Sequence, residues 1–125
     1  MPARLRVEKP SAVAAALQRR DPADLKLLTK HFLAVLAETA PGRSVEVRVP
    51  PYAAAQVIPG VRHTRGTPPA VIETDAATWI ELATGELAWT DAIASGRIIA
   101  SGERTDLTAY LPLTTTPTTR TPNED

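Results

Sequence analysis

The apolar repeat of this chain changes abruptly at one point, and that change is the strongest constraint on its fold. Across residues 22–40, large apolar side chains recur three and four positions apart, which is the spacing of an amphipathic helix that buries one face. These residues are Leu25, Leu28, Phe32 and Leu36. After Pro41 and Gly42, Val45, Val47 and Val49 alternate with polar residues, as in a strand with one buried face. The sequence therefore predicts an α+β domain.

Local signals place further elements around this boundary. Ser11 is predicted to cap a short helix that ends before Asp21, and Asp21 with Pro22 supplies the N-cap and the first position of the long helix. Two more strands are expected over residues 52–58 and 70–74. Because short connections usually join neighbouring antiparallel strands, we expect these strands to form a meander with the valine strand.

The C-terminal half is predicted to repeat the order of helix and strand. Asp75 is placed to cap a helix that ends at Gly85, and a shorter helix over residues 90–95 leads into a last strand over residues 97–101. In that strand, alternation directs Ile98 and Ala100 to one side and Ile99 to the other.

The chain is expected to form one domain over residues 1–113, with a final helical turn at 106–111. Residues 114–125 are rich in Thr and Pro and almost lack large apolar side chains. Burial cannot offset the entropy of ordering such a segment, so we expect it to be disordered.

Composition narrows the function classes. The 14 basic residues balance the 14 acidic ones, so no overall field favours nucleic acid as a partner. The absence of cysteine removes disulfides, thiolate nucleophiles and sulfur-ligated metals. The charged N-terminus lacks an apolar signal region, and no run is long enough to span a bilayer. We therefore expect a cytoplasmic protein without an integral membrane segment.

The sequence holds no convincing catalytic constellation. His31 and His63 lie far apart, and neither has a second ligand at a familiar metal spacing. Glu73 and Asp75 could form a carboxylate pair for acid–base work, but Asp75 is better explained as a helix cap. We expect no enzymatic activity, no metal and no cofactor.

One segment carries a family resemblance. The stretch ETDAATWIELATGELAWTDAIASGRIIASG, residues 73–102, combines an acidic cap, an aromatic-bearing helix, a glycine stop, a short helix ending in SG, and an Ile-rich strand followed by a glycine. In this order it resembles the C-terminal half of the sterol carrier protein type-two family. The upstream VPPYAAAQVIPGVRHTRGTPPAVIETD is similar to the bacterial branch, in which such a domain also follows a mycothiol-dependent maleylpyruvate isomerase type of domain.

The resemblance implies a mostly antiparallel, curved sheet of four to five strands covered by helices, with an apolar tunnel for a fatty-acyl or sterol-like molecule. Five residues are the candidates for its wall: Trp79, Leu82, Leu87, Trp89 and Ile93. Apolar pockets need such side chains. The alternative is that they simply fill the core, as an apolar helical stripe does in any globular domain.

The loop RHTRGTPP is the candidate for the polar end of the ligand. Its Arg62, His63 and Arg65 could hold a carboxylate or phosphate, because a guanidinium binds such groups bidentately. The alternative is a solvated turn whose arginines pair with Glu73, Asp75 or Glu103.

Two functions of different classes follow. The first is a carrier that holds a hydrophobic small molecule between sheet and helices. The second is a non-catalytic interaction or accessory domain, with a second copy of the chain or an enzyme as its partner. A mycothiol-dependent enzyme is the weakest reading, because the metal-binding half of the fused isomerases has no counterpart in this sequence.

Overall fold

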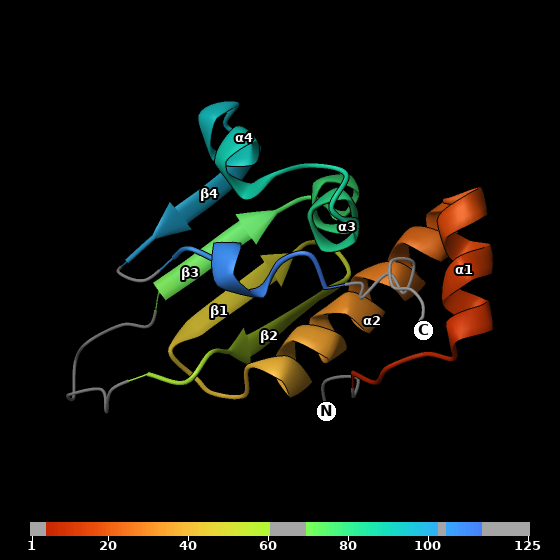
Figure 1. Cartoon of the computed structure of the whole chain (residues 1–125), viewed down its shortest axis with the longest axis horizontal. Coiled ribbons are helices and arrows are strands. Elements are labelled where there is room, and N and C mark those ends of the chain that lie inside the picture. Colours follow the sequence, from red (N-terminus) through yellow and green to blue (C-terminus); the bar gives the residue numbers. More distant parts are fainter. Residues whose placement is uncertain (1–4, 61–69, 103–104, 114–125) are drawn as a thin grey trace, which may run out of the picture.

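The computed structural model describes residues 5–60, 70–102 and 105–113, and Figure 1 shows their arrangement. The elements are, in order, α1 (Pro10–Arg19), α2 (Pro22–Thr39), β1 (Val45–Val49), β2 (Ala53–Val57), β3 (Ala70–Thr74), α3 (Ala76–Thr84), α4 (Trp89–Ala94), β4 (Ile98–Ser101) and the 3₁₀ turn η1 (Thr108–Tyr110). The α+β prediction is confirmed. The change of period after Gly42 separates α2 from β1, as expected.

The described strands form one sheet in the order β2-β1-β3-β4. β1 pairs antiparallel with β2, and β3 pairs antiparallel with β4. β1 and β3 run parallel. The sheet is thus four-stranded and mostly antiparallel, within the predicted range.

The predicted meander is wrong, because β3 pairs with β1 and not with β2. The parallel strands β1 and β3 are joined by residues 50–69, which contain β2, so this connection exceeds the dozen or so residues that a parallel crossover needs. This strand order also buries the valine-rich strand at an inner position of the sheet. It places β1, whose Val45, Val47 and Val49 are fully buried, between two strands, and leaves the alanine-rich β2 at an edge.

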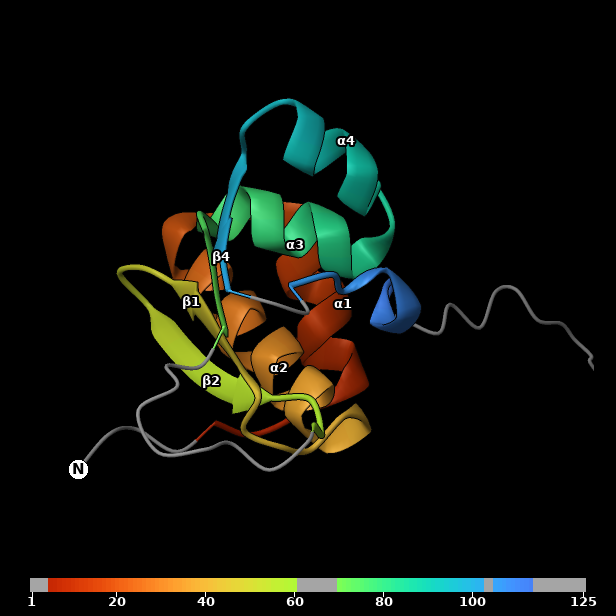
Figure 2. The ribbon, with the colours of Figure 1, turned by 90° about the vertical axis from the view of Figure 1, so that its left-hand side faces the viewer.

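All the described helices lie on one side of the sheet, which we call the inner face (Figure 2). The core fills the layer between this face and the helices. Its largest fully buried side chains are Trp79, Phe32, Leu28, Leu33, Leu36, Ile72, Ile80, Leu82, Leu107, Val45, Val47 and Val49. Residues 105–113 cross the helical side, and the N–H of Leu113 anchors them by donating to the carbonyl of Ala83 at 2.8 Å.

Two of the predicted helix caps are confirmed and one is wrong. The N–H of Asp21 donates to the carboxylate of Asp24 at 3.0 Å in a capping box, and Asp75 accepts the N–H of Thr78 at 2.8 Å. Ser11 does not cap α1. That helix begins at Pro10 with Lys9 at the N-cap, because the fixed φ of proline suits the first helical position.

Candidate functional site

The predicted apolar wall is partly assembled between sheet and helices. Trp79 and Leu82 project from α3 and are each 1% exposed, and Trp89, the first residue of α4, is also buried. Leu87, in the α3–α4 connection, is half-buried and packs against the same core. Ile93 is 43% exposed and lies outside this cluster. Four of the five residues therefore share one apolar layer.

Trp79 is held in place by a specific contact. Its indole N–H donates to the backbone carbonyl of Thr29 on α2 at 3.3 Å. This bond satisfies the polar atom of a side chain that is otherwise buried among apolar groups, as buried indoles require. Trp79 thus links α3 to α2 as well as filling the layer.

The helical layer stops short of one edge of the sheet. Ala100 on β4 pairs with Ile72 on β3, so both side chains point to the inner face. Ile72 is buried, yet Ala100 is exposed. At Ala100, therefore, the inner face of the sheet is open to solvent.

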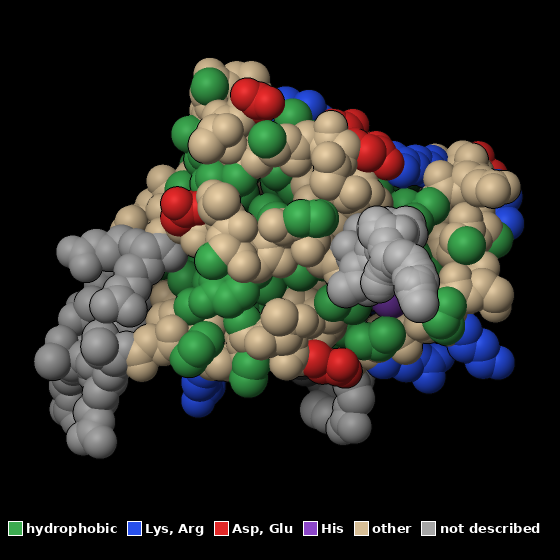
Figure 3. All heavy atoms as spheres, in the orientation of Figure 1, with side chains coloured by type: hydrophobic (Ala, Val, Ile, Leu, Met, Phe, Trp, Pro, Cys, Tyr) green, Lys and Arg blue, Asp and Glu red, His purple; other side chains and the backbone are tan. Residues whose placement is uncertain are grey.

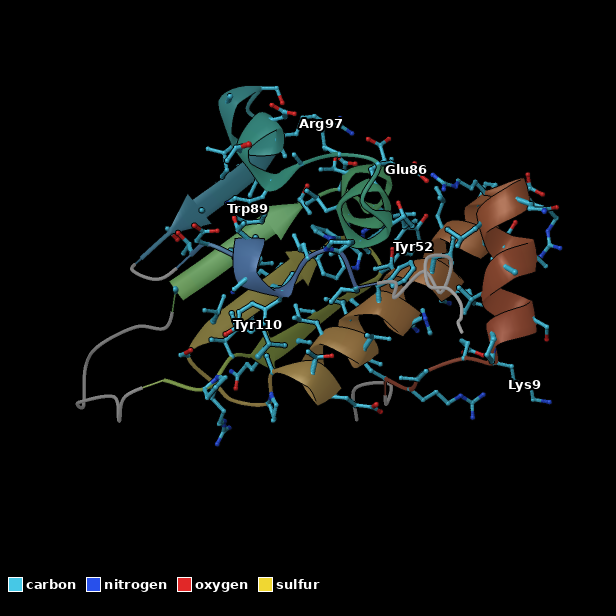
Figure 4. The ribbon with its side chains drawn as sticks, viewed as in Figure 1. Lys9, Tyr52, Glu86, Trp89, Arg97 and Tyr110 are labelled. Atoms are coloured by element: carbon cyan, nitrogen blue, oxygen red, sulfur yellow. The ribbon has the colours of Figure 1, made fainter. Side chains whose placement is uncertain are left out.

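The surroundings of this opening are apolar. Ile98, which faces the same way as Ala100, is buried, and so is Leu107 just before η1. Figure 4 shows Trp89 between α4 and η1, and Tyr110 on the other side of that turn. Figure 3, which views the helical side, shows hydrophobic side chains reaching the surface beside α4 and η1. We call the exposed inner surface at Ala100, together with the buried side chains of Trp89 and Ile98, the β4 rim.

The candidate polar end, Arg62, His63 and Arg65, lies outside the described residues. Asp75, one of the carboxylates considered as a pairing partner for this loop, is engaged by Thr78, whose hydroxyl donates to it at 3.0 Å. Glu73 is half-buried and projects from the side of β3 opposite to Ile72.

Sequence reasoning missed two depressions on the other side of the sheet. One, of about 230 Å³, is lined by Pro50, Glu73, Thr74, Asp75, Gly96, Arg97 and Ile99. The second, of about 320 Å³, is lined by Arg48, Pro50, Pro51, Tyr52, Ala53 and Ala54. They meet at Pro50. The alternation of β4, which directs Ile99 away from the core, was the one sequence signal for this region.

His31 acts as a packing residue. Its Nδ1 accepts a hydrogen bond from the backbone N–H of Glu8 at 2.9 Å, and its ring packs edge-on against Phe32. Burial lowers its pKa, and the charge of Glu8 opposes this shift to a smaller extent. Within the described ranges no three His, Asp or Glu side chains gather as metal ligands.

This arrangement predicts a pH dependence of stability. Burial favours the neutral imidazole in the folded protein, so the unfolded chain binds the proton more readily. The free energy of unfolding should therefore fall as the pH drops from about 7 through the lowered pKa of His31. We expect His31→Asn, which keeps an acceptor but does not titrate, to lose this part of the dependence. Urea midpoints at pH 7.5 and 5.5 test it, and the same pH dependence in both proteins would contradict it.

Comparison with known proteins adds one finding. Residues 21–113 match a family model described as Bacterial SCP ortholog. The match spans α2, the four described strands, α3, α4 and η1, and leaves α1 outside. A search of curated proteins found no match. No helix in the described part of the chain is long and apolar enough to cross a membrane.

Proposed function

This chain belongs to the bacterial SCP ortholog family, and from that premise we propose that it is a non-catalytic carrier that holds a fatty-acyl or sterol-like molecule between its sheet and helices. The observation that supports this most directly is the β4 rim. There the apolar inner layer meets solvent at Ala100.

A ligand would enter by displacing α4. This helix has only six residues, and its N-cap residue, Ala88, makes no side-chain cap. A helix this short has little stability of its own. An outward movement of α4 would carry Trp89 away from the layer and open a path from Ala100 toward Trp79 and Leu82. The long helix α2 and the central strand β1 would keep their positions.

The affinity of such a site would come from burial of the alkyl chain. Each added methylene should contribute about 0.8 kcal/mol, which is roughly a fourfold decrease in Kd. Saturated fatty acids of increasing length are the probe, and the emission of the two tryptophans of the chain reports binding. A Kd that does not change with chain length would contradict the carrier function.

A variant at the rim tests the route of entry. Ala100→Asp places a charge where the alkyl chain would cross the inner face, and we expect it to weaken binding at least tenfold, because an unpaired carboxylate resists desolvation. Ala77→Asp makes the same change at an exposed position of α3 and should bind as the wild type does. Equal affinity in the two variants would place the entry elsewhere.

The second candidate function, an interaction domain, is favoured by the side of the sheet that no described helix covers (Figure 2). Native mass spectrometry of gently purified protein, with analysis of an organic extract, separates the two functions. A carrier should retain lipid, whereas an interaction domain should be empty and associate with a protein partner.

A further inference from the structure

The uncovered side of the sheet, which we call the outer face, carries an ordered row of side chains. The strand registers align Ala54 with Arg48, Arg48 with Glu73, and Glu73 with Ile99. Because paired residues point to the same side of a sheet, the row across β2, β1, β3 and β4 reads apolar, basic, acidic, apolar. The valines that neighbour Arg48 along β1 are buried on the inner side.

The row is accessible to a partner. Ile99 is 69% exposed and the side chain of Arg48 is 50% exposed, and no described helix lies over them. Together with the apolar lining of the adjoining depression at Pro50, this isoleucine forms an exposed apolar surface of the kind that marks an interaction site. At the opposite end of the row, Ala54 lines the depression of about 320 Å³ beside Pro50 and Tyr52.

We propose that the outer face binds the outer face of a second copy of this chain, about a two-fold axis that runs parallel to the strands between β1 and β3. This operation places β1 over β3 of the other copy, and β2 over β4. Arg48 of each copy then faces Glu73 of the other, and Ile99 faces the depression at Ala54. The surface is complementary to itself, as a two-fold interface requires.

Charge selects this partner. An apolar stripe alone would accept many surfaces. In this row, however, β1 carries a basic residue and β3 an acidic one, so the two-fold axis places each charge against the opposite charge of the second copy. Glu46, which contacts Arg48 at 3.0 Å, lies in the next row, opposite Val71 of the other copy. The dimer therefore forms two equivalent Arg48–Glu73 contacts between copies.

The outer face is small for a protein–protein interface. Four strands about 4.8 Å apart and about five residues long cover roughly 15 by 17 Å, well below the roughly 800 Å² per partner of a standard interface. We therefore expect a weak, transient dimer that forms only at high protein concentration. The dimer leaves the β4 rim open, because Ala100 points to the inner face.

Charge reversal gives a direct test by sedimentation equilibrium of the full chain. The wild type should change from monomer to dimer with concentration. In R48E both facing positions carry carboxylates, and in E73R both carry guanidinium groups, so each variant alone should dimerise at least about tenfold more weakly. In an equimolar mixture, every facing pair is again one acidic and one basic group, and a heterodimer should form.

The mixture separates association from folding. A variant that merely folds poorly cannot be rescued by another single variant, and circular dichroism of each variant checks its fold. Ile99→Ser should also weaken the wild-type dimer by severalfold. The proposal is overturned if the wild type stays monomeric to millimolar concentration, if the charge reversals leave dimerisation unchanged, or if the mixture does not associate. Lipid retention is measured separately, so failure here leaves the carrier function intact.

Discussion

Gly42→Ala is expected to lower the free energy of unfolding by about 3 kcal/mol or more, a large part of the roughly 5–15 kcal/mol that holds a domain folded. A Cβ at this position would lie 2.1 Å from the carbonyl oxygen of Ile58 and 2.5 Å from the nitrogen of Pro59. Both are backbone atoms, so no side-chain rotation can relieve the overlap.

The backbone at Ile58 cannot move away without breaking other bonds. Its carbonyl accepts the N–H of Ser44 at 3.2 Å and the hydroxyl of Ser44 at 2.7 Å. Its own N–H donates to the carbonyl of Ala40 at 2.6 Å. These bonds join the end of β2 to the segment between α2 and β1. A shift that makes room for the methyl group would leave buried polar groups without partners, at a cost of about 1–3 kcal/mol each.

Urea unfolding followed by circular dichroism measures this effect, and Gly96→Ala is the matched control. Gly96 has φ +76°, but a Cβ there would meet nothing within 4 Å. Only the penalty of the left-handed conformation remains, about 1–2 kcal/mol. If the two substitutions cost the same, the close contact between Gly42 and Ile58 is not what makes the first position sensitive.

The elements that sequence reasoning found are those specified within a few residues. Asp21 with Pro22 marks the start of α2, Asp75 with Gly85 marks both ends of α3, and the alternating valines mark β1, because each signal acts through the local backbone. The strand order could not be found in this way. Whether β3 lies beside β1 or β2 depends on how the apolar area of all four strands is distributed, which no single segment encodes.

The candidate site also has a part that could be predicted from the sequence and a part that depends on how the elements pack together. The family resemblance, which places two helices along an apolar tunnel, was enough to select Trp79, Leu82 and Trp89 for the layer next to the sheet. The exposure of Ala100 was not predictable, because it depends on where the helical layer ends. Nor did the sequence show that Ala54, Arg48, Glu73 and Ile99 form one row. That row exists only because β3 crossed to the far side of β1.

Trp79→Ala should have the largest effect in the core, because Trp79 is 1% exposed and is the largest fully buried side chain. Removing it takes away its apolar contacts and its bond to Thr29, and leaves a cavity. Substitutions of this kind cost about 3–5 kcal/mol. Trp79→Phe keeps a ring in the layer and should cost less than half as much. Urea midpoints of the three proteins at neutral pH measure the series.

The same series decides whether Trp79 is core or ligand wall. A core residue lowers stability when truncated and affects ligand affinity only through the fraction folded. A wall residue that a ligand displaces is already poorly packed, so truncation would cost little stability and change the Kd directly. The bond to Thr29 and the burial of Trp79 predict the first outcome. For Trp89→Ala we expect a direct change in the Kd, because Trp89 belongs to the short α4 and borders the β4 rim, with a smaller loss of stability than for Trp79→Ala, because Trp89 is also buried. Two tryptophans of one layer would then have separable roles, one in stability and one in binding. A large loss of stability in Trp89→Ala with unchanged affinity for fatty acids would contradict that division.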